Sequence, residues 1–434
     1  MASAERIESA VVLPPAPRWS AATRVAFRFS VVYLGLTILS TQLFSAVFML
    51  PGPRFLTGVN DLLVWIGTHV FRVNDPIPVE FTGSGDTLLN WVLASTVLII
   101  AACVTAVWSG VSRRDSYPRM NMWFRLLVRF ALGATLVRYG LGKLIPAQMP
   151  TIFLARLVEP YGDFSPMGVL WSSIGASPAY EMCVGAIEAI PGILLFLPRT
   201  TLLGALLALM ATTGVFVLNM TYDVPVKLLS FHLVLMSLFL LAPYGRNLRD
   251  LLLLNRSLVP AQEPAIGRTP RRRRHWVVAQ TAYGALIVLL AIAAAFSLWS
   301  RTGPNAEKSP LFGIWEVQQM TVDGDVRPPL LTDKTRWRRV IMQVPTAAVF
   351  QKMDDSFEHF TTEFATDGKT LTITPASGSG TSTVTYQRLS PKLMVIDGTI
   401  DGRVVRLELT PRDLNSFVLN SRGFNWVQNV PFNR

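Results

Sequence analysis

Residues 188–205 read EAIPGILLFLPRTTLLGA, and this stretch decides the fold because it holds two apolar runs divided only by Pro198 and Arg199. The runs extend on either side to residues 178–197 and 200–219. A helix needs about 20 apolar residues to cross the hydrocarbon core of a bilayer, so each run has the length of one crossing. So short a link predicts a tight helical hairpin within a membrane.

The composition of the whole chain agrees with a membrane protein. The chain has 434 residues, of which 50% are hydrophobic and 16% are charged, whereas soluble proteins carry about 25% charged residues. We therefore expect a multi-pass α-helical bundle of about seven spans. Beside the hairpin, the further spans are expected at residues 25–50, 87–109, 123–145, 226–243 and 276–299.

Arginines concentrate in alternate loops and set the orientation of the spans. They occur in the tail at residues 1–24, between the second and third spans, in the hairpin, and in the loop at residues 251–275 with its run Arg271–Arg274. The net charge of +12 therefore reflects membrane topology rather than nucleic-acid binding. The positive-inside rule predicts a cytoplasmic N-terminus, seven crossings and an extracytoplasmic C-terminal domain. We expect the protein in the cell (inner) membrane. The arginine run is expected to contact anionic lipid.

Two segments outside the predicted spans are also apolar. Within the N-terminal region, residues 25–120, the side chains of residues 55–72 repeat at helical spacing, which predicts an amphipathic helix on the outer surface rather than an eighth span. Residues 147–176 hold two short apolar stretches broken by Pro160 and Pro166. We expect them to cap the outer mouth of the bundle.

Ionisable and amide side chains lie within or beside successive predicted spans. A charge at the bilayer centre costs roughly 2.5–3.5 kcal/mol on insertion scales, so such groups tend to face a bundle interior. The directions of the spans put all of these groups in the outer half of the membrane, which predicts one shared pocket for a ligand or a proton. The candidate residues are Arg138, Lys143, Glu181, Glu188, Asn219, Asp223, Lys227 and His232.

Arg138 and Glu188 form the leading predicted ion pair, because a guanidinium matches a carboxylate in shape and charge. A purely structural pair is an equal alternative to a ligand site. His232 titrates nearest to neutrality, which favours a proton carrier, and a hydrogen-bonded core histidine is the alternative. Asp223 and Lys227 lie four residues apart and can pair across a helical turn. We find no spacing typical of a metal site, and no nucleotide-binding or catalytic-triad motif.

After a linker at residues 303–309, the composition changes to short alternating runs. Residues 305–434 therefore form a separate domain, which we expect to be an antiparallel β-barrel or sandwich. The predicted strands are 313–320, 369–374, 382–388, 403–409 and 415–420. The predicted hairpin turns are Asp323-Gly324, Asp367-Gly368, Asp397-Gly398 and Asp401-Gly402.

The segment PLFGIWEV, residues 310–317, resembles the first strand of lipocalin-like barrels through Gly313 and Trp315. The resemblance implies that Trp315 closes the barrel floor against an arginine of a late strand, with Arg406 and Arg422 as the candidates. A small β domain in which Trp315 is only a core residue is the alternative. A ligand cavity in this domain would be apolar.

Residues 121–250 carry four motifs in four successive spans: RYGLGKLI from Arg138, the hairpin stretch from Glu188, NMTYDVPVKLLSFHLVL from Asn219, and LAPYGRNL from Leu241. This pattern resembles the DoxX family of small four-helix bacterial membrane proteins, which includes a relative of the membrane subunit of thiosulfate:quinone oxidoreductase. The resemblance implies a four-helix core associated with redox chemistry, and a quinone as its ligand.

Three functions remain open from the sequence. The first is a redox- or quinone-associated membrane subunit, although no internal electron carrier is evident and Cys103 and Cys183 form no Cys-x-x-Cys pair. The second is a non-enzymatic protein that binds or carries a lipid or another small amphiphile, with the β domain sharing in the binding. The third is a scaffold that docks a periplasmic protein through the β domain. The sequence does not decide whether the chain is an enzyme.

Overall fold

The computed structural model describes residues 18–52, 58–149, 152–256, 269–378 and 380–433. The chain divides into two compact units, one comprising Met1–Leu141 and Gly185–Ile292, and the other comprising Gly142–Val184 and Ala293–Arg434. Most of the predicted N-terminal tail, and residues 257–268 of the predicted basic loop, lie outside the described residues. Within the described ranges, seven helices are long and apolar enough to cross a membrane, as predicted.

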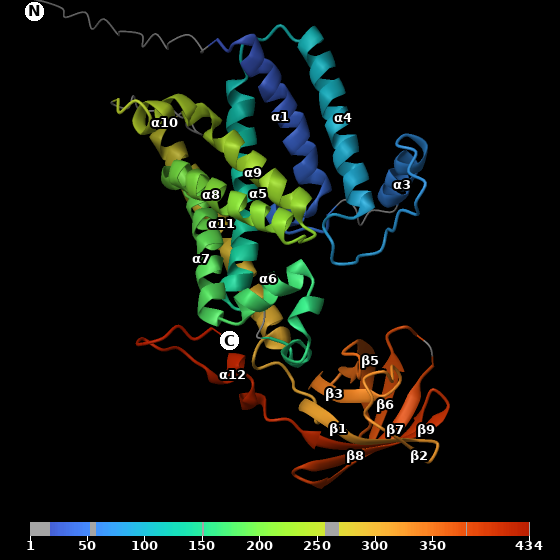
Figure 1. The fold of residues 1–434 in the computed structure, drawn as a ribbon. Coiled ribbons are helices and arrows are strands. Elements are labelled where there is room, and N and C mark those ends of the chain that lie inside the picture. The colour runs from blue at the N-terminus through green and yellow to red at the C-terminus, as the bar shows by residue number, and fades with distance from the viewer. Residues whose placement is uncertain (1–17, 53–57, 150–151, 257–268, 379, 434) are drawn as a thin grey trace, which may run out of the picture. The chain divides into compact units, whose positions relative to one another are not determined.

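The helices follow the hydropathy of the sequence closely (Figure 1). The long ones are α1 (Ala21–Ser40), α4 (Leu88–Val111), α5 (Pro118–Leu144), α7 (Pro178–Phe196), α8 (Thr201–Thr221), α9 (Lys227–Leu241) and α11 (Pro270–Thr302). The short ones are α2 (Gln42–Phe48), α3 (Val59–His69), α6 (Pro166–Gly175), α10 (Gly245–Leu252) and α12 (Val418–Ser421). Single 3₁₀ turns are η2 (Leu154–Leu157), η3 (Tyr161–Asp163), η4 (Pro198–Thr200), η5 (Ala242–Tyr244) and η6 (Leu414–Ser416).

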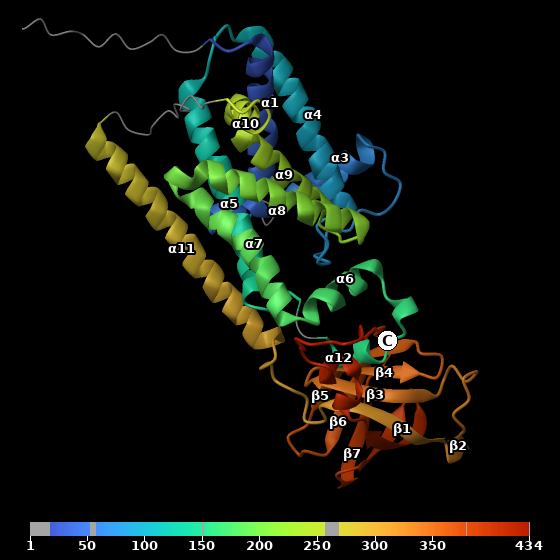
Figure 2. The same ribbon diagram turned by 60° about the vertical axis from the view of Figure 1, so that its left-hand side comes forward.

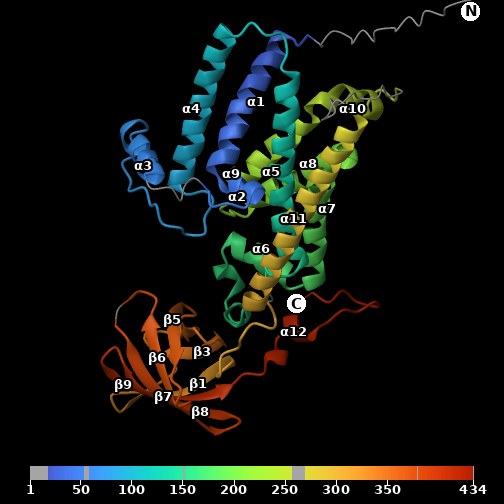
Figure 3. The same ribbon diagram turned by 180° about the vertical axis from the view of Figure 1, so that it is seen from behind.

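The first predicted span is not one continuous helix, so the prediction of residues 25–50 as a single span is wrong. Thr41 is extended, with φ −116° and ψ −177°, and separates α1 from α2, which Figure 3 shows at the end of α1. The hydroxyls of Ser40 and Thr41 donate to backbone carbonyls one turn back, which competes with helix continuation. The last long helix along the chain, α11, begins at Pro270, so the run Arg271–Arg274 is helical rather than part of a loop.

The predicted amphipathic helix is present as α3, and residues 55–57 lie outside the described residues. Its 11 residues span about 16 Å, which is too short for a crossing. Leu63 and Gly67 are buried, whereas Leu62 and Trp65 are more than half exposed. A Cβ on Gly67 would lie 3.2 Å from Val92 of α4, so this glycine lets the two helices approach closely.

Small residues bring α5 and α7 together in the core of the helical unit. A Cβ on Gly133 would lie 3.0 Å from the Gly192 carbonyl, and one on Gly192 would lie 2.8 Å from the Gly133 carbonyl. One on Gly140 would lie 2.4 Å from the Ala189 backbone nitrogen. Close backbone approach at small residues is the usual basis of helix association in membranes. These contacts fix the rotation of α5 about its axis, and therefore the direction in which the residues after Val137 point.

The C-terminal domain is a closed antiparallel barrel (Figure 2). Eight of the nine strands, all except β2, follow one another around the barrel, and β1 pairs with β9 to close it. The strands are β1 (Gly313–Val322), β2 (Asp325–Arg327), β3 (Trp337–Val344), β4 (Ala347–Lys352), β5 (Phe357–Phe364), β6 (Thr370–Pro375), β7 (Ser382–Ser390), β8 (Leu393–Ile400) and β9 (Arg403–Pro411).

Two of the strand and turn predictions are wrong. Residues 415–420 fall in η6 and α12 rather than in a strand. Asp397-Gly398 lies inside β8, where a Cβ on Gly398 would come within 2.7 Å of the Val384 Cα on β7. That glycine therefore serves close strand packing. By contrast, Asp401-Gly402 joins β8 to β9 with positive φ at both residues, as a tight hairpin requires.

Apolar side chains fill the barrel. An eight-stranded barrel is just wide enough for its side chains to pack the interior, and one cluster of twenty buried residues does so here. Within it, the Phe350 ring lies 4.9 Å from the Trp337 ring and 4.7 Å from the Phe360 ring. The interior of the barrel is thus a protein core.

Candidate functional site

The helical unit contains a cavity of about 690 Å³. Its lining comes from α1, α2, α3, α4, α5 and α9, together with the segment 78–87, which precedes α4. Small-molecule sites in proteins commonly have volumes of about 300–1,000 Å³ and mostly apolar walls with a few polar groups. Leu93, Val97 and Leu229 supply apolar wall here, and Thr37 and Ser40 supply hydroxyls.

Arg138 and His232 are the two predicted site residues that line this cavity. The Arg138 side chain is exposed, although α5 is otherwise largely buried around it. Tyr139, the next residue, donates a hydrogen bond to the side-chain carbonyl of Gln42 at 3.2 Å, and both residues line the cavity. Residues from α2 and α5 therefore form one polar wall.

Glu188 is 4% exposed and lies on α7. Tyr139 lies within electrostatic reach of both Arg138 and Glu188. The direct ion pair between Arg138 and Glu188 stays a prediction, and Tyr139 is a neighbour of both groups that the sequence did not reveal. The sequence signal was present, because Tyr139 stands inside the motif that begins at Arg138.

Both ring nitrogens of His232 have hydrogen-bond partners. Nδ1 lies 2.6 Å from the Leu228 carbonyl, which can only accept, so Nδ1 carries a proton and donates. Nε2 then accepts from the Tyr33 hydroxyl at 2.9 Å in the neutral ring, and the two rings stack at 5.5 Å. His232 is thus a hydrogen-bonded core histidine, and a second proton on Nε2 would require the Tyr33 hydroxyl to change from donor to acceptor. Tyr33 comes from α1, outside the four-helix motif region.

Asn219, Asp223 and Lys227 organise the turn between α8 and α9. The Asn219 amide donates to the Val226 carbonyl at 3.3 Å and to the Ser230 hydroxyl at 3.0 Å. Lys227 pairs with Asp223 at 2.8 Å, which confirms the predicted pairing of these two residues. The three side chains therefore stabilise the turn, and none of them is among the residues that line the cavity.

Asp86 is a structural residue that the sequence did not single out. Its two carboxylate oxygens accept from the backbone N–H groups of Lys227 at 2.7 Å and Leu228 at 3.0 Å, at the start of α9. A carboxylate at a helix N-terminus satisfies unpaired N–H groups and the helix dipole. The contact joins residues 141 apart, so no local pattern could reveal it. It holds the segment 78–87 as a wall of the cavity.

Lys143 and Glu181 belong to the other compact unit. Glu181 is 1% exposed, and its carboxylate accepts from the Met149 backbone N–H at 2.9 Å. The charge of Lys143, which is 6% exposed, acts on Glu181. Among the eight candidates, Arg138 and His232 line the cavity, Asn219, Asp223 and Lys227 organise a turn, Glu188 is buried on α7, and Lys143 and Glu181 interact within the other unit. One pocket shared by all eight stays a prediction, since span direction fixes depth but not the rotation of each helix.

The predicted floor arginines of the barrel also require correction. Gly313 has φ +141° and starts β1, and the buried Trp315 donates from Nε1 to the Leu311 carbonyl at 2.9 Å. The guanidinium that lies against the Trp315 ring, at 5.3 Å, belongs to Arg388 of β7.

Arg406 and Arg422 lie elsewhere. Arg406 is on the outward face of β9, between the buried Val405 and Leu407, and pairs with Asp397 at 3.2 Å. Strand alternation places every second residue outside, which explains this position. Arg422 follows α12 and contacts Gln428 and the ring of Phe432.

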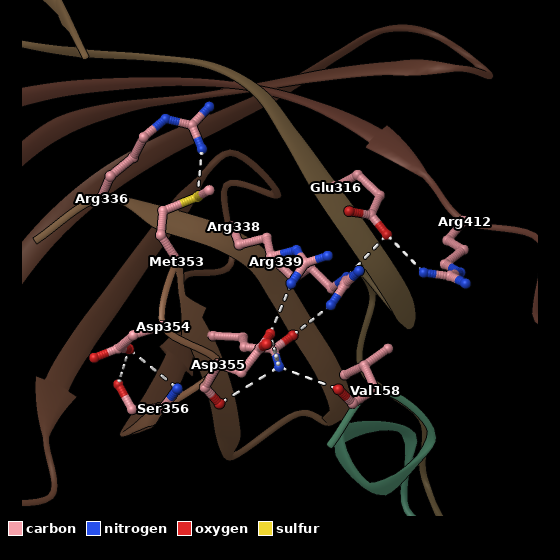
Figure 4. A network of polar contacts seen from close by, with 11 residues as sticks. Val158, Glu316, Arg336, Arg338, Arg339, Met353, Asp354, Asp355, Ser356 and Arg412 are labelled. Atoms are coloured by element: carbon pink, nitrogen blue, oxygen red, sulfur yellow. Dashed lines mark hydrogen bonds and ion pairs between the residues drawn. The ribbon is translucent and has the colours of Figure 1, made fainter. Parts of the chain in front are cut away.

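The outer face of the barrel carries a second network, which binds the segment 154–158 (Figure 4). Gln351 is fully buried, accepts from Arg339 at 2.7 Å and donates to the Val158 carbonyl at 3.1 Å. Leu154 packs with Ile314 and Ile341, which face outward from the barrel. This part of the predicted cap therefore holds the barrel, and the capping of the bundle by residues 147–176 stays a prediction.

Glu316 extends this network along β1. One of its carboxylate oxygens accepts from Arg339 at 2.9 Å and from Arg412 at 3.1 Å (Figure 4). The described residues contain no group of three or more His, Cys, Asp and Glu side chains that could hold a metal ion. The polar contacts of this face are therefore ion pairs within the barrel domain and hydrogen bonds to the docked segment.

The fold and the cavity define a class: a multi-pass helical membrane protein that carries a closed eight-stranded β-barrel. The chain is 30% identical over 118 residues to the uncharacterized protein YwoB of Bacillus subtilis (strain 168), an alignment that covers 27% of this chain and 72% of YwoB. The chain belongs to the family of YwoB. No protein-family model matches the chain, and no solved structure matches it.

Proposed function

We propose that the protein is a redox-associated membrane subunit that binds a quinone-class amphiphile in the cavity of its helical unit. The observation that carries the proposal is a cavity of about 690 Å³, within a set of membrane-length helices, that combines apolar walls with the cationic side chain of Arg138. The resemblance of residues 121–250 to the DoxX family supports the same ligand class.

The cavity lining suits a flat headgroup with carbonyl oxygens. Arg138 can donate hydrogen bonds to such an oxygen, since a guanidinium carries five N–H donors and no acceptor. His232 is the weaker donor, because its Nδ1 proton already binds the Leu228 carbonyl. Leu93, Val97 and Leu229 offer the apolar contact that an aromatic ring and its tail require. Glu188, within electrostatic reach of Tyr139, is the proposed proton acceptor.

The alternative is a non-enzymatic protein that binds or carries a lipid or another small amphiphile. The same cavity supports it, since hydroxyls from Thr37, Ser40 and Thr87 suit many polar headgroups. The packed interior of the barrel speaks against the barrel sharing that ligand. The filled barrel also suits a scaffold that docks a periplasmic protein through its outer surface.

We further propose that the chain lies in the cell (inner) membrane with a cytoplasmic N-terminus and an extracytoplasmic barrel. The arginine-rich start of α11 supports this orientation through the positive-inside rule. A membrane-impermeant thiol reagent should label Val404→Cys from outside intact cells and leave Arg272→Cys unlabelled until the membrane is permeabilised. The reverse pattern contradicts the orientation.

The ligand is tested on full-length protein purified in mild detergent. We expect organic extraction to release a quinone, with an oxidised-minus-reduced ultraviolet difference spectrum, in about one equivalent per chain. Arg138→Gln should lower that content several-fold, whereas Arg119→Gln, an exposed arginine on the same helix, should not. Respiratory activity of membranes should fall with Glu188→Gln.

Protein without extractable quinone, together with unchanged respiration in Glu188→Gln, contradicts the redox proposal. Extraction of another lipid that depends on Arg138 in the same way supports the binding or carrier alternative.

A further inference from the structure

The last residues of the chain expose apolar side chains that the barrel does not cover. Phe424 is 78% exposed, Trp426 is 90% exposed, and Val427 and Val430 are 78% and 75% exposed. Soluble protein surfaces seldom show large contiguous apolar patches unless these bind a partner or a membrane. The C-terminal segment, defined as residues 418–433, therefore has the character of a binding surface.

This segment is attached to the barrel and internally ordered. Just before it, Leu414 and Phe417 pack on the outer apolar cluster of the barrel. The Phe424 and Trp426 rings meet edge to face at 5.0 Å. The Arg422 guanidinium lies 4.7 Å from the Phe432 ring and donates to Gln428. The exposed side chains are thus held on a folded support.

The C-terminal segment is grouped with the end of a membrane-length helix. It belongs to the same compact unit as Ala293–Thr302, the end of α11. The apolar part of α11 ends near Trp299 and Arg301, side chains typical of the membrane–water interface.

The composition of the segment matches a lipid headgroup layer. Residues 418–433 include a tryptophan, two phenylalanines and an arginine, and contain no aspartate or glutamate. Aromatic rings with amide and cationic neighbours favour the interface, and cations favour anionic lipid. A protein partner of ordinary composition gives no reason for the complete lack of acidic residues.

We propose that the C-terminal segment inserts Phe424, Trp426, Val427 and Val430 into the headgroup layer of the chain's own membrane, on the side of the barrel. The barrel is then held at the membrane at two places, through α11 and through this segment. The inference is independent of any ligand in the cavity of the helical unit.

The test measures the depth of one labelled residue in full-length protein. In a Cys103→Ala, Cys183→Ala background, Asn429→Cys carries an environment-sensitive fluorophore, and Val404→Cys on the outward face of β9 is the reference position. The protein is placed in vesicles of phosphatidylcholine and phosphatidylglycerol with or without lipid spin-labelled near the headgroup. Spin-labelled lipid should quench the label at position 429 at least about two-fold, as expected for a shallow interfacial segment. Quenching at position 404 should be negligible.

A second variant separates insertion from the fold of the barrel. Phe424→Ser with Trp426→Ser should reduce quenching at position 429 to the level of position 404. Val326→Ser with Leu330→Ser removes two exposed apolar side chains elsewhere on this domain and should change nothing. A label at 429 that emits as in water overturns the proposal. A label that is shielded from water yet unquenched by lipid also overturns it, because the occupant is then protein.

Discussion

The helical unit and the barrel differ in how their interiors are filled. The helical unit contains a cavity, which is lined by residues that include Thr37, Ser40, Arg138 and Tyr139. Inside the barrel, strand alternation turns apolar side chains inward, and they fill the space. From this difference we propose that a ligand binds in the helical unit and that the barrel acts through its outer surface.

The largest expected effect is in the barrel core. Phe350→Ala removes a ring packed between Trp337 and Phe360, and should lower the free energy of unfolding of the barrel by about 3–5 kcal/mol. Protease susceptibility of the full-length protein in rising urea measures this loss. Val404→Ala, at an exposed position of β9, is the control. Little change in Phe350→Ala indicates a loosely packed barrel and removes the contrast.

A smaller loss is expected on the outer face of the barrel. Gln351→Leu removes the donor to the Val158 carbonyl and one of the two acceptors of the Arg339 guanidinium, which should cost about 1–3 kcal/mol. Hydrogen exchange should accelerate in the segment 154–158 and remain slow in the barrel interior. Gln318→Leu, at an exposed position of β1, is a matched control. Equal exchange in both variants contradicts a docking role for Gln351.

In the helical unit, Asp86→Ala removes the cap of α9. The loss of a capping side chain should cost about 1 kcal/mol. Because the same contact holds a wall of the cavity, ligand content should fall together with stability. Asp75→Ala, in the same region of the chain, serves as the control for a change of charge. Unaltered ligand content in Asp86→Ala shows that the segment 78–87 is dispensable for binding.

Arg388→Gln tests which arginine lies at Trp315. An exposed cation over an aromatic ring contributes about 0.5–1 kcal/mol, so the barrel should lose that amount. Arg406→Gln removes a surface pair with Asp397, and its effect should be smaller at high salt. If Arg406→Gln lowers the free energy of unfolding in urea more than Arg388→Gln does, the assignment of Arg388 to the barrel floor is contradicted.

The smallest effect concerns pH. Hydrogen bonds from the Thr335 hydroxyl and backbone hold the pKa of Asp333 below its usual range, and the Ser356 hydroxyl does the same for the pKa of Asp354. A carboxyl whose pKa is lowered by folding stabilises the fold above its unfolded pKa of about 3.9, and this stabilisation is lost as pH falls towards the folded pKa. The unfolding midpoint of the barrel should therefore drop below about pH 4, and Asp333→Asn should flatten that dependence. A midpoint that rises on acidification contradicts this assignment.

The sequence predicted those features that depend on local composition. The length of the apolar runs predicted the seven spans. The dipeptide Asp401-Gly402 predicted a hairpin, because these residue types tolerate the left-handed backbone that the turn adopts. The sequence could not predict contacts set by helix rotation or by distant segments. His232 meets Tyr33 from α1, and Gln351 meets Val158 from a loop that hydropathy describes only as a broken apolar run. For Arg138, the predicted depth in the membrane was enough to place the residue at a pocket. Asn219 was predicted at a similar depth, but it stabilises a turn.

Native mass spectrometry of the full-length protein, released from its own membrane in mild detergent, tests the central claim most directly. Ala94 lines the cavity, whereas Ala102 of the same helix is exposed. We predict one bound small molecule in the unaltered protein and in Ala102→Trp, and its loss in Ala94→Trp. A molecule that remains bound in Ala94→Trp, or unaltered protein that carries none, contradicts the assignment of ligand binding to this cavity.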